Sequence, residues 1–186
     1  MRKGSEKLIH YHYTDTEMNK ILKTLTIIID TRENVNGHIL DYLHAKEIPI
    51  KNKALKTGDY SAMIPANPEL GINRDLYLNG CIERKNSIDE ITGNLGKDKR
   101  TAFENELIRA SQNPFTLIVE DKDGYEKILK GNYRSKYDPK ALLGTLKTFE
   151  ARYNFSIVYL DKKFSGNYIY HHFYYMAKEY LKRGAL

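Results

Sequence analysis

The chain carries the segment Ile82-Glu83-Arg84-Lys85, and Asp59 stands upstream of it, directly after a glycine. Side chains alternate between the two faces of a β-strand, so a strand over this segment places Glu83 and Lys85 on one face and Arg84 on the other. A second predicted strand begins directly after Asp59 and can lie beside the first. The pattern therefore predicts two carboxylates and an ammonium group on one face of a sheet.

This combination of groups suits the metal-dependent hydrolysis of a phosphodiester bond. The carboxylates of Asp59 and Glu83 are hard oxygen ligands for Mg²⁺, which usually keeps several waters and also binds substrate phosphate. The metal lowers the pKa of a bound water, and Lys85 can orient that water and stabilise the developing charge. Asp30, at the end of a buried apolar run, is a third predicted metal ligand, because α/β sites usually form at strand ends. Mn²⁺ accepts the same kinds of ligand and can substitute.

Three segments of the chain occur in the order of a known signature. They are Ile29-Asp30-Thr31-Arg32-Glu33, Gly58-Asp59-Tyr60 and Glu83-Arg84-Lys85-Asn86-Ser87-Ile88-Asp89. Together they resemble the nuclease-domain signature of the XPF family, whose core is a Gly-Asp pair followed downstream by Glu-Arg-Lys-x-x-x-Asp. That family belongs to the PD-(D/E)xK superfamily with the restriction-endonuclease-like fold. The resemblance covers roughly residues 25–159.

The resemblance implies a role for each matching residue. Asp59 and Glu83 resemble the metal-binding carboxylates, and Lys85 resembles the catalytic lysine. Asp30 and Glu33 resemble the acidic residues of the first motif, and Asp30 joins Asp59, Glu83 and Lys85 as a catalytic candidate. The supporting candidates are Glu33, together with Arg32 and Arg84 as arginines that hold the acidic cluster or contact DNA, and Asp89 as the last aspartate of the motif.

Outside the motif, apolar β-branched runs alternate with amphipathic stretches. This alternation predicts an α/β fold, a restriction-endonuclease-like mixed central sheet flanked by helices. We expect an N-terminal arm with a short helix over residues 1–24 and a single XPF-type nuclease domain over residues 25–186, ending in an aromatic helix. Asn79-Gly80, between two short apolar runs, is typical of a two-residue hairpin. The predicted strands are 25–30, 50–55, 60–64, 76–78, 81–83, 115–120 and 155–160, and the predicted helices are 16–23, 35–46, one from 87, 101–111, 138–153 and 166–183.

Composition and charge favour an anionic partner and argue against several other classes. The net charge is +6 and the pI is about 9.1, a balance that attracts nucleic acid. No apolar run reaches the roughly 20 residues that span a bilayer, and the N-terminus lacks the apolar core of a signal peptide. The single cysteine, Cys81, excludes an internal disulfide and a Cys-rich zinc site. The sequence contains no glycine-rich loop of the P-loop kind, so it does not indicate a nucleotide cofactor. We expect a cytoplasmic protein of a bacterial or phage-infected cell, or of an equivalent DNA-containing compartment.

Two loops are candidates for DNA contact. Residues 93–100 are basic and flanked by glycine, and residues 131–137 interleave basic residues with aromatic ones that can stack on bases. Each is either a DNA contact or an ordinary solvated loop. Asp89 is either part of the motif or a carboxylate favoured by the dipole of a helix first turn. Arg32 and Arg84 are better explained as structural ion-pair partners. The basic candidates are Lys97, Lys99, Arg100, Arg134 and Lys136.

The complete motif favours an active, Mg²⁺-dependent DNA endonuclease. The XPF resemblance implies cleavage of branched or flapped DNA, in repair or recombination, by a homodimer. A surplus of aromatic residues on the last helix also favours a homodimer. Members of that family usually carry a tandem helix-hairpin-helix domain after the nuclease. This sequence shows no such pattern, which suggests a stand-alone nuclease domain from a phage or a mobile element. Two alternatives stay open, a non-catalytic DNA-binding scaffold subunit and a Holliday-junction resolvase.

Overall fold

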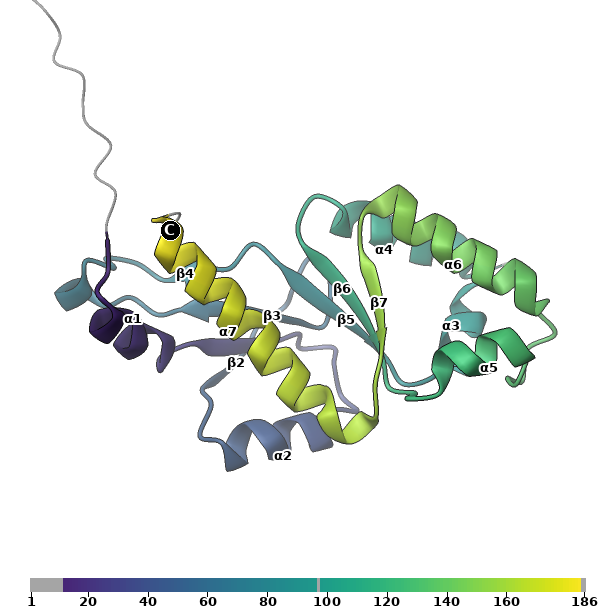
Figure 1. Ribbon diagram of the computed structural model, residues 1–186, viewed down its shortest axis with the longest axis horizontal. Helices are drawn as coiled ribbons and strands as arrows, with labels where there is room; N and C mark the ends of the chain where they lie inside the picture. The colour runs from purple at the N-terminus through teal and green to yellow at the C-terminus, as the bar shows by residue number, and fades with distance from the viewer. Residues whose placement is uncertain (1–11, 97, 185–186) are drawn as a thin grey trace, which may run out of the picture.

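The computed structural model describes residues 12–96 and 98–184 (Figure 1). The strands are β1 (Thr26–Ile29), β2 (Ile50–Asn52), β3 (Tyr60–Ile64), β4 (Leu76–Tyr77), β5 (Cys81–Lys85), β6 (Phe115–Val119) and β7 (Ser156–Tyr159). The α-helices are α1 (Asp15–Leu22), α2 (Gly37–Ala45), α3 (Ile88–Asn94), α4 (Arg100–Ala110), α5 (Gly124–Lys130), α6 (Pro139–Tyr153) and α7 (Ser165–Arg183), and the 3-10 helices are η1 (Pro68–Leu70) and η2 (Lys162–Phe164).

Within the described residues, the strands form one mixed sheet. Its order is β2-β1-β3-β5-β6-β7, and β4 pairs with β3. β1 is parallel to β2, and β5, β6 and β7 are mutually parallel. β3 is antiparallel to β1 on one side and to β5 on the other, so it joins the two parallel halves. The predicted α/β fold with a mixed central sheet is confirmed.

Two separate apolar clusters cover the two faces of this sheet. Ile27, Ile82 and Ile118 belong to the cluster that α1, α2 and α7 complete, on what we call the α7 face. Cys81 and Leu117 belong to the cluster that α3, α4, α5 and α6 complete, on what we call the α4 face. Figure 1 shows α3 to α6 gathered at the β5–β7 end of the sheet and α1, α2 and α7 at the β1–β3 end. The two helical layers are therefore offset along the sheet.

Side-chain caps mark the beginnings of α1 and α6. Asp138 accepts a hydrogen bond from the Ala141 N–H, and Pro139 occupies the first turn of α6, where its missing N–H costs nothing. Thr14 and Glu17 form a capping box at the start of α1. α1 buries its apolar side against the α7 face. A boundary between an arm and a domain at residue 24 stays a prediction, and residues 1–11 lie outside the described part. No helix in the described part is long and apolar enough to cross a membrane.

The predicted hairpin at Asn79-Gly80 is wrong. β4 and β5 do not pair with each other, because both lie along the same edge of β3. Leu76 faces Ile64, and Ile82 faces Tyr60, so residues 76–85 run as one interrupted strand. The Asn79-Gly80 pair is an extra loop within that strand and not a turn between partners. The sequence analysis also misses α5, because it predicts no helix between residues 121 and 137.

Candidate active site

The predicted catalytic residues meet where β3 begins beside β5. The Asp59 N–H donates to the Ile82 carbonyl at 2.9 Å, and the Arg84 N–H donates to Asp59 Oδ2 at 2.8 Å. On β5 itself, Lys85 Nζ donates to Glu83 Oε1 at 2.6 Å. The structure therefore brings Asp59, Glu83 and Lys85 together, as the alternation of side chains along adjacent strands predicts.

Burial makes negative charge at this site costly. Glu83 and Lys85 are only 5% and 7% exposed. Burial, followed by the charge of Glu83, raises the pKa of Asp59 to about 7. Burial also raises the pKa of Glu83 to about 7, because Lys85 offsets only part of the effect. Burial lowers the pKa of Lys85, but the carboxylates of Glu83, Glu106 and Glu90 together raise it above its ordinary value. The positive charge around Asp59 and Glu83 is therefore too small to offset the burial of their carboxylates.

A third carboxyl group, that of Glu106 on α4, lies near Glu83 and is absent from the residues predicted from the sequence. It is within hydrogen-bonding reach of Glu83 and adds to the effect of burial in raising the pKa of that residue. Phe103 anchors this part of α4, since it is buried and its ring centre lies 5.8 Å from Lys85 Nζ. Glu106 follows Phe103 by three residues and so shares its side of the helix. That spacing is the signal by which the sequence could reveal it.

Asp30 is placed beside Asp59 but has its carboxylate engaged elsewhere. The Asp30 N–H donates to the Asp59 carbonyl at 2.8 Å. Asp30 Oδ1 accepts hydrogen bonds from the Arg32 N–H and Nε at 2.8 and 2.7 Å, and Oδ2 accepts one from the Leu55 N–H at 2.6 Å. The Arg32 side chain holds the pKa of Asp30 at about 2. Asp30 therefore ties two loops together, and its use as a metal ligand stays a prediction that requires some of these bonds to break.

Arg84 points to the α7 face, away from the catalytic candidates, and is the centre of a buried ion network. Its Nη2 donates to Glu33 Oε1 at 2.6 Å and its Nη1 to Glu120 Oε2 at 2.9 Å. Glu120 also accepts from Ser165 Oγ at 2.6 Å and contacts His38 Nε2 at 2.5 Å. The network supports the interpretation of Arg84 as a structural ion-pair partner. Like Asp30, Glu120 directly follows a buried strand. This position is the only feature of the sequence that indicates a role for Glu120.

Comparison with known proteins gives the family. The model of the ERCC4 domain matches residues 29–172. The chain belongs to the ERCC4 domain family. None of the proteins with curated descriptions matches the sequence significantly.

Solved structures show the fold of this ERCC4 domain. The structure of XPF from Aeropyrum pernix is 17% identical, with a TM-score of 0.55 over 86% of this chain and 67% of that chain. A structure titled as the complex of that protein with DNA is 16% identical, with a TM-score of 0.57 over 83% of this chain and 65% of that chain. This chain thus spans about two thirds of the Aeropyrum chain. The XPF-type fold expected from the sequence is confirmed, and family membership supports a DNA endonuclease.

The donor set of the ERCC4 domain fits a partly hydrated divalent ion. Asp59 and Glu83 each present one carboxylate oxygen that accepts no hydrogen bond from a protein N–H, hydroxyl or ammonium donor within residues 12–96 and 98–184. In the same residues, no three His, Cys, Asp or Glu side chains form a ready cage for a metal ion. Mg²⁺ is usually bound by one or two carboxylates together with waters and substrate phosphates, so two ligands suffice. Asp59 and Glu83 are the residues that would hold the ion.

The other predicted residues lie away from this centre. Asp89 accepts a hydrogen bond from the Arg134 N–H at 2.8 Å and so anchors the loop of residues 131–137. Glu90, next to it, is the residue that approaches Lys85, at 3.7 Å. Arg100 begins α4 and donates to Tyr137 Oη at 3.3 Å. Arg134, Lys99 and Lys136 are exposed, and Lys97 lies outside the described residues.

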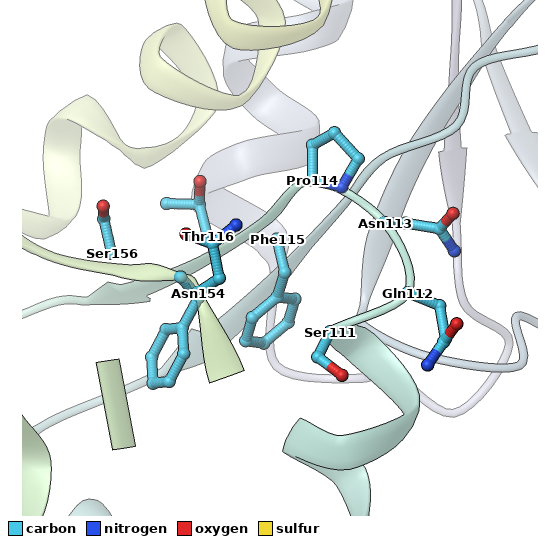
Figure 2. Close-up of a pocket in the computed structure, with 9 residues that line it drawn as sticks. Ser111, Gln112, Asn113, Pro114, Phe115, Thr116, Asn154 and Ser156 are labelled. Atoms are coloured by element: carbon cyan, nitrogen blue, oxygen red, sulfur yellow. The ribbon is translucent and has the colours of Figure 1, made fainter. Parts of the chain in front are cut away.

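A hollow of about 470 Å³ lies at the opposite end of the parallel strands (Figure 2). It is formed where β6 and β7 begin, whereas Glu83 and Lys85 lie at the end of β5. All of its lining residues are uncharged: Ser111, Gln112, Asn113, Pro114, Phe115, Thr116, Asn154, Phe155 and Ser156. This hollow has no groups for acid–base or metal chemistry, so it is not the candidate active site.

Proposed function

We propose that this ERCC4 domain is a Mg²⁺-dependent endonuclease that hydrolyses phosphodiester bonds in branched or flapped DNA during repair or recombination. The observation that carries the proposal is the meeting of Asp59, Glu83 and Lys85 at one point of the sheet. The net charge of +6 supports an anionic substrate. The similar fold of an XPF protein whose structure is titled as a complex with DNA supports the same substrate class.

The side chains divide the work of hydrolysis. Asp59 and Glu83 would hold the ion, whose chemistry is to neutralise charge on the scissile phosphate and to activate water. Lys85 Nζ, a buried cation, stabilises negative charge that develops as the phosphorus–oxygen bond breaks. Arg84 keeps β5 in place from the α7 face through Glu33 and Glu120. Mn²⁺ is expected to replace Mg²⁺, because both accept carboxylate and water ligands.

We further propose a homodimer in a DNA-containing compartment, the cytoplasm of a bacterial or phage-infected cell. α7 and the 3-10 helix before it leave two large aromatic side chains exposed, Tyr175 at 58% and Phe164 at 54%. A second copy of the chain would bury such a surface. Light scattering at several protein concentrations measures the oligomeric state directly.

Cleavage assays test the proposed activity. Labelled flap, splayed-arm, four-way-junction and duplex DNA are incubated with the protein in Mg²⁺ and in EDTA. We expect cleavage that requires Mg²⁺ and that Glu83→Ala/Lys85→Ala abolishes. Glu126→Ala/Lys130→Ala is the matched control, because it removes an exposed ion pair of the same residue types on α5 and is expected to cut normally.

The preferred DNA and the presence of cleavage decide between the alternatives. Selective cutting of four-way junctions would indicate a Holliday-junction resolvase. Binding of DNA without cleavage in Mg²⁺ or Mn²⁺ would contradict the endonuclease and leave a scaffold subunit as the better account.

A further inference from the structure

Among residues 12–96 and 98–184, no helix covers one part of the α4 face. Ile28 and Met63 lie on this face, since Ile28 pairs with Ser61 and Thr26 pairs with Met63, two and four residues along β3 from Asp59. Both are buried, at 1% and 4% exposure. Neither belongs to the apolar clusters that the helices of the described chain complete. Something other than a helix must therefore shield them from water.

Lysine side chains do part of this shielding. Lys51 pairs with Ile28, and its Nζ atom reaches across to lie 3.8 Å from Met63 Sδ. Lys53 extends over the same region, with its Nζ atom 3.9 Å from the centre of the Tyr77 ring. Lysine stems commonly cover apolar surface in this way while the ammonium group stays in water. We call the surface made by Lys51, Lys53 and Tyr77 the lysine-covered face.

This face carries an excess of positive charge. Asp75 lies 3.6 Å from Lys51 and balances that residue. Lys53 and Lys56 are exposed and have no carboxylate within 4.0 Å among residues 12–96 and 98–184. A surface of this kind attracts phosphate groups.

The lysine-covered face leads directly to the candidate active site. Tyr77 is the cross-strand partner of Met63, which is four residues from Asp59 along β3, or about 13 Å at the usual rise of a strand. Lys56 stands between the two regions, because it precedes Asp59 by three residues and lines the same small hollow as Cys81 on β5. A DNA strand that lay on this face would therefore extend toward Asp59.

We propose that the lysine-covered face binds a single-stranded segment of DNA next to the cleavage point, an inference that deepens the proposed function and rests on it. The ammonium groups of Lys53 and of the neighbouring Lys56 contact phosphates. Tyr77, 48% exposed, stacks on a base. Stacking needs an unpaired base, and lysines alternating with an aromatic ring are the usual platform for single strands. Branched and flapped DNA supply such a segment.

Binding of a fluorescent oligo(dT) strand in EDTA tests the assignment without cleavage. Anisotropy is measured at several salt concentrations for Lys53→Gln/Lys56→Gln, Tyr77→Ala and Tyr77→Phe. Each phosphate contact on a single strand contributes about 0.7 to the slope of log affinity against log salt, so the double lysine variant is expected to lose about 1.4. Tyr77→Ala is expected to weaken binding at least about fivefold, whereas Tyr77→Phe keeps the ring and the affinity.

Matched variants separate binding from folding. Lys178→Gln/Lys182→Gln removes two positive charges from α7, on the other side of the sheet, and is expected to bind as the wild type does. Lys53→Arg/Lys56→Arg keeps the charges and is expected to retain the salt slope. If the double glutamine variant unfolds, the comparison of Tyr77→Ala with Tyr77→Phe still decides the question.

Two results would overturn the inference. One is unchanged oligo(dT) binding by the lysine and Tyr77→Ala variants. The other is an equal loss of binding to plain duplex and to oligo(dT), which would indicate a surface for the backbone of any DNA. Cleavage by the wild type is a separate measurement. If the wild type cleaves DNA and the variants bind oligo(dT) normally, only this inference is contradicted. If the variants lose binding but the wild type does not cleave DNA, only the proposed endonuclease activity is contradicted.

Discussion

Lys85 Nζ lies 2.6 Å from Glu83 Oε1, and the two residues stand two positions apart on a fully buried strand. Within the described residues, Lys85 is the only cationic side chain that bonds directly to the carboxylate of Asp59 or Glu83. One lysine does not balance the site, since the pKa of Glu83 stays raised to about 7 despite this bond. The site therefore combines a built-in cation with carboxylates that a second cation would still stabilise.

Lys85→Met is expected to slow cleavage strongly while leaving DNA binding in place. The substitution keeps a long apolar stem in a buried position but removes the charge that stabilises the leaving oxygen. Loss of one such group typically slows an enzyme by about 10²–10³-fold. Single-turnover cleavage in Mg²⁺ gives the rate, and anisotropy with branched DNA in EDTA gives the affinity. A variant that cuts at the wild-type rate would remove Lys85 from the mechanism.

Asp30→Asn is expected to destabilise the protein at neutral pH by about 2 kcal/mol. Arg32 holds the folded-state pKa of Asp30 at about 2, below the usual value of 3.8. A depressed pKa gives stability that is present above the unfolded-state value and is lost as the pH falls toward 2. Urea unfolding at pH 7 and pH 3 measures the difference, which is expected to shrink at the lower pH. If Asn is as stable as Asp at pH 7, the bonds of Asp30 to Arg32 and Leu55 contribute nothing net.

Glu120→Ala is expected to cost about 3–5 kcal/mol, because it leaves Arg84 buried with one of its two partners removed. The Glu120 side chain is fully buried and also bonds Ser165 and His38, so α2, β5 and α7 lose a common anchor. Urea unfolding measures the effect. Glu126→Ala on α5 removes an exposed carboxylate and is expected to stay within about 0.5 kcal/mol of the wild type. Similar stability of the two variants would mean that the network is not a stabilising element.

Strands and helices could be predicted where their signals are local. The apolar runs at residues 27–29 and 115–119 are buried on both faces, which leaves few other structures open to them. The Asn79-Gly80 hairpin fails for the opposite reason. The turn signal is local, but the residues on both sides of it gain more by pairing with β3 than with each other.

The residues of the candidate site also divide into those that local sequence patterns predict and those that they do not. Asp59 and Glu83 are on neighbouring strands, and alternation along those strands predicts that they meet. Glu106 and His38 reach the site or its supporting network only because helices pack against the sheet at a particular offset. The three-residue spacing of Glu106 from Phe103 places both residues on one side of α4. No pattern within one segment gives the offset of a helix against the sheet, so the contacts of Glu106 and His38 require the folded structure.

Glu106→Gln is expected to change how stability depends on pH in the metal-free protein. Burial and Glu106 keep the folded-state pKa of Glu83 raised to about 7, above an unfolded-state value near 4.5. Between these values the folded state binds the extra proton, so stability is expected to fall as the pH rises. Removing the Glu106 carboxyl group lowers the pKa of Glu83, and the fall should become smaller. Urea unfolding in EDTA at pH 5 and pH 8 measures it, with Glu126→Gln as the control for loss of an exposed carboxylate. An unchanged pH dependence in Glu106→Gln, matching that of the control, would show that Glu106 does not act on Glu83. Glu106 would then have no place in the active site.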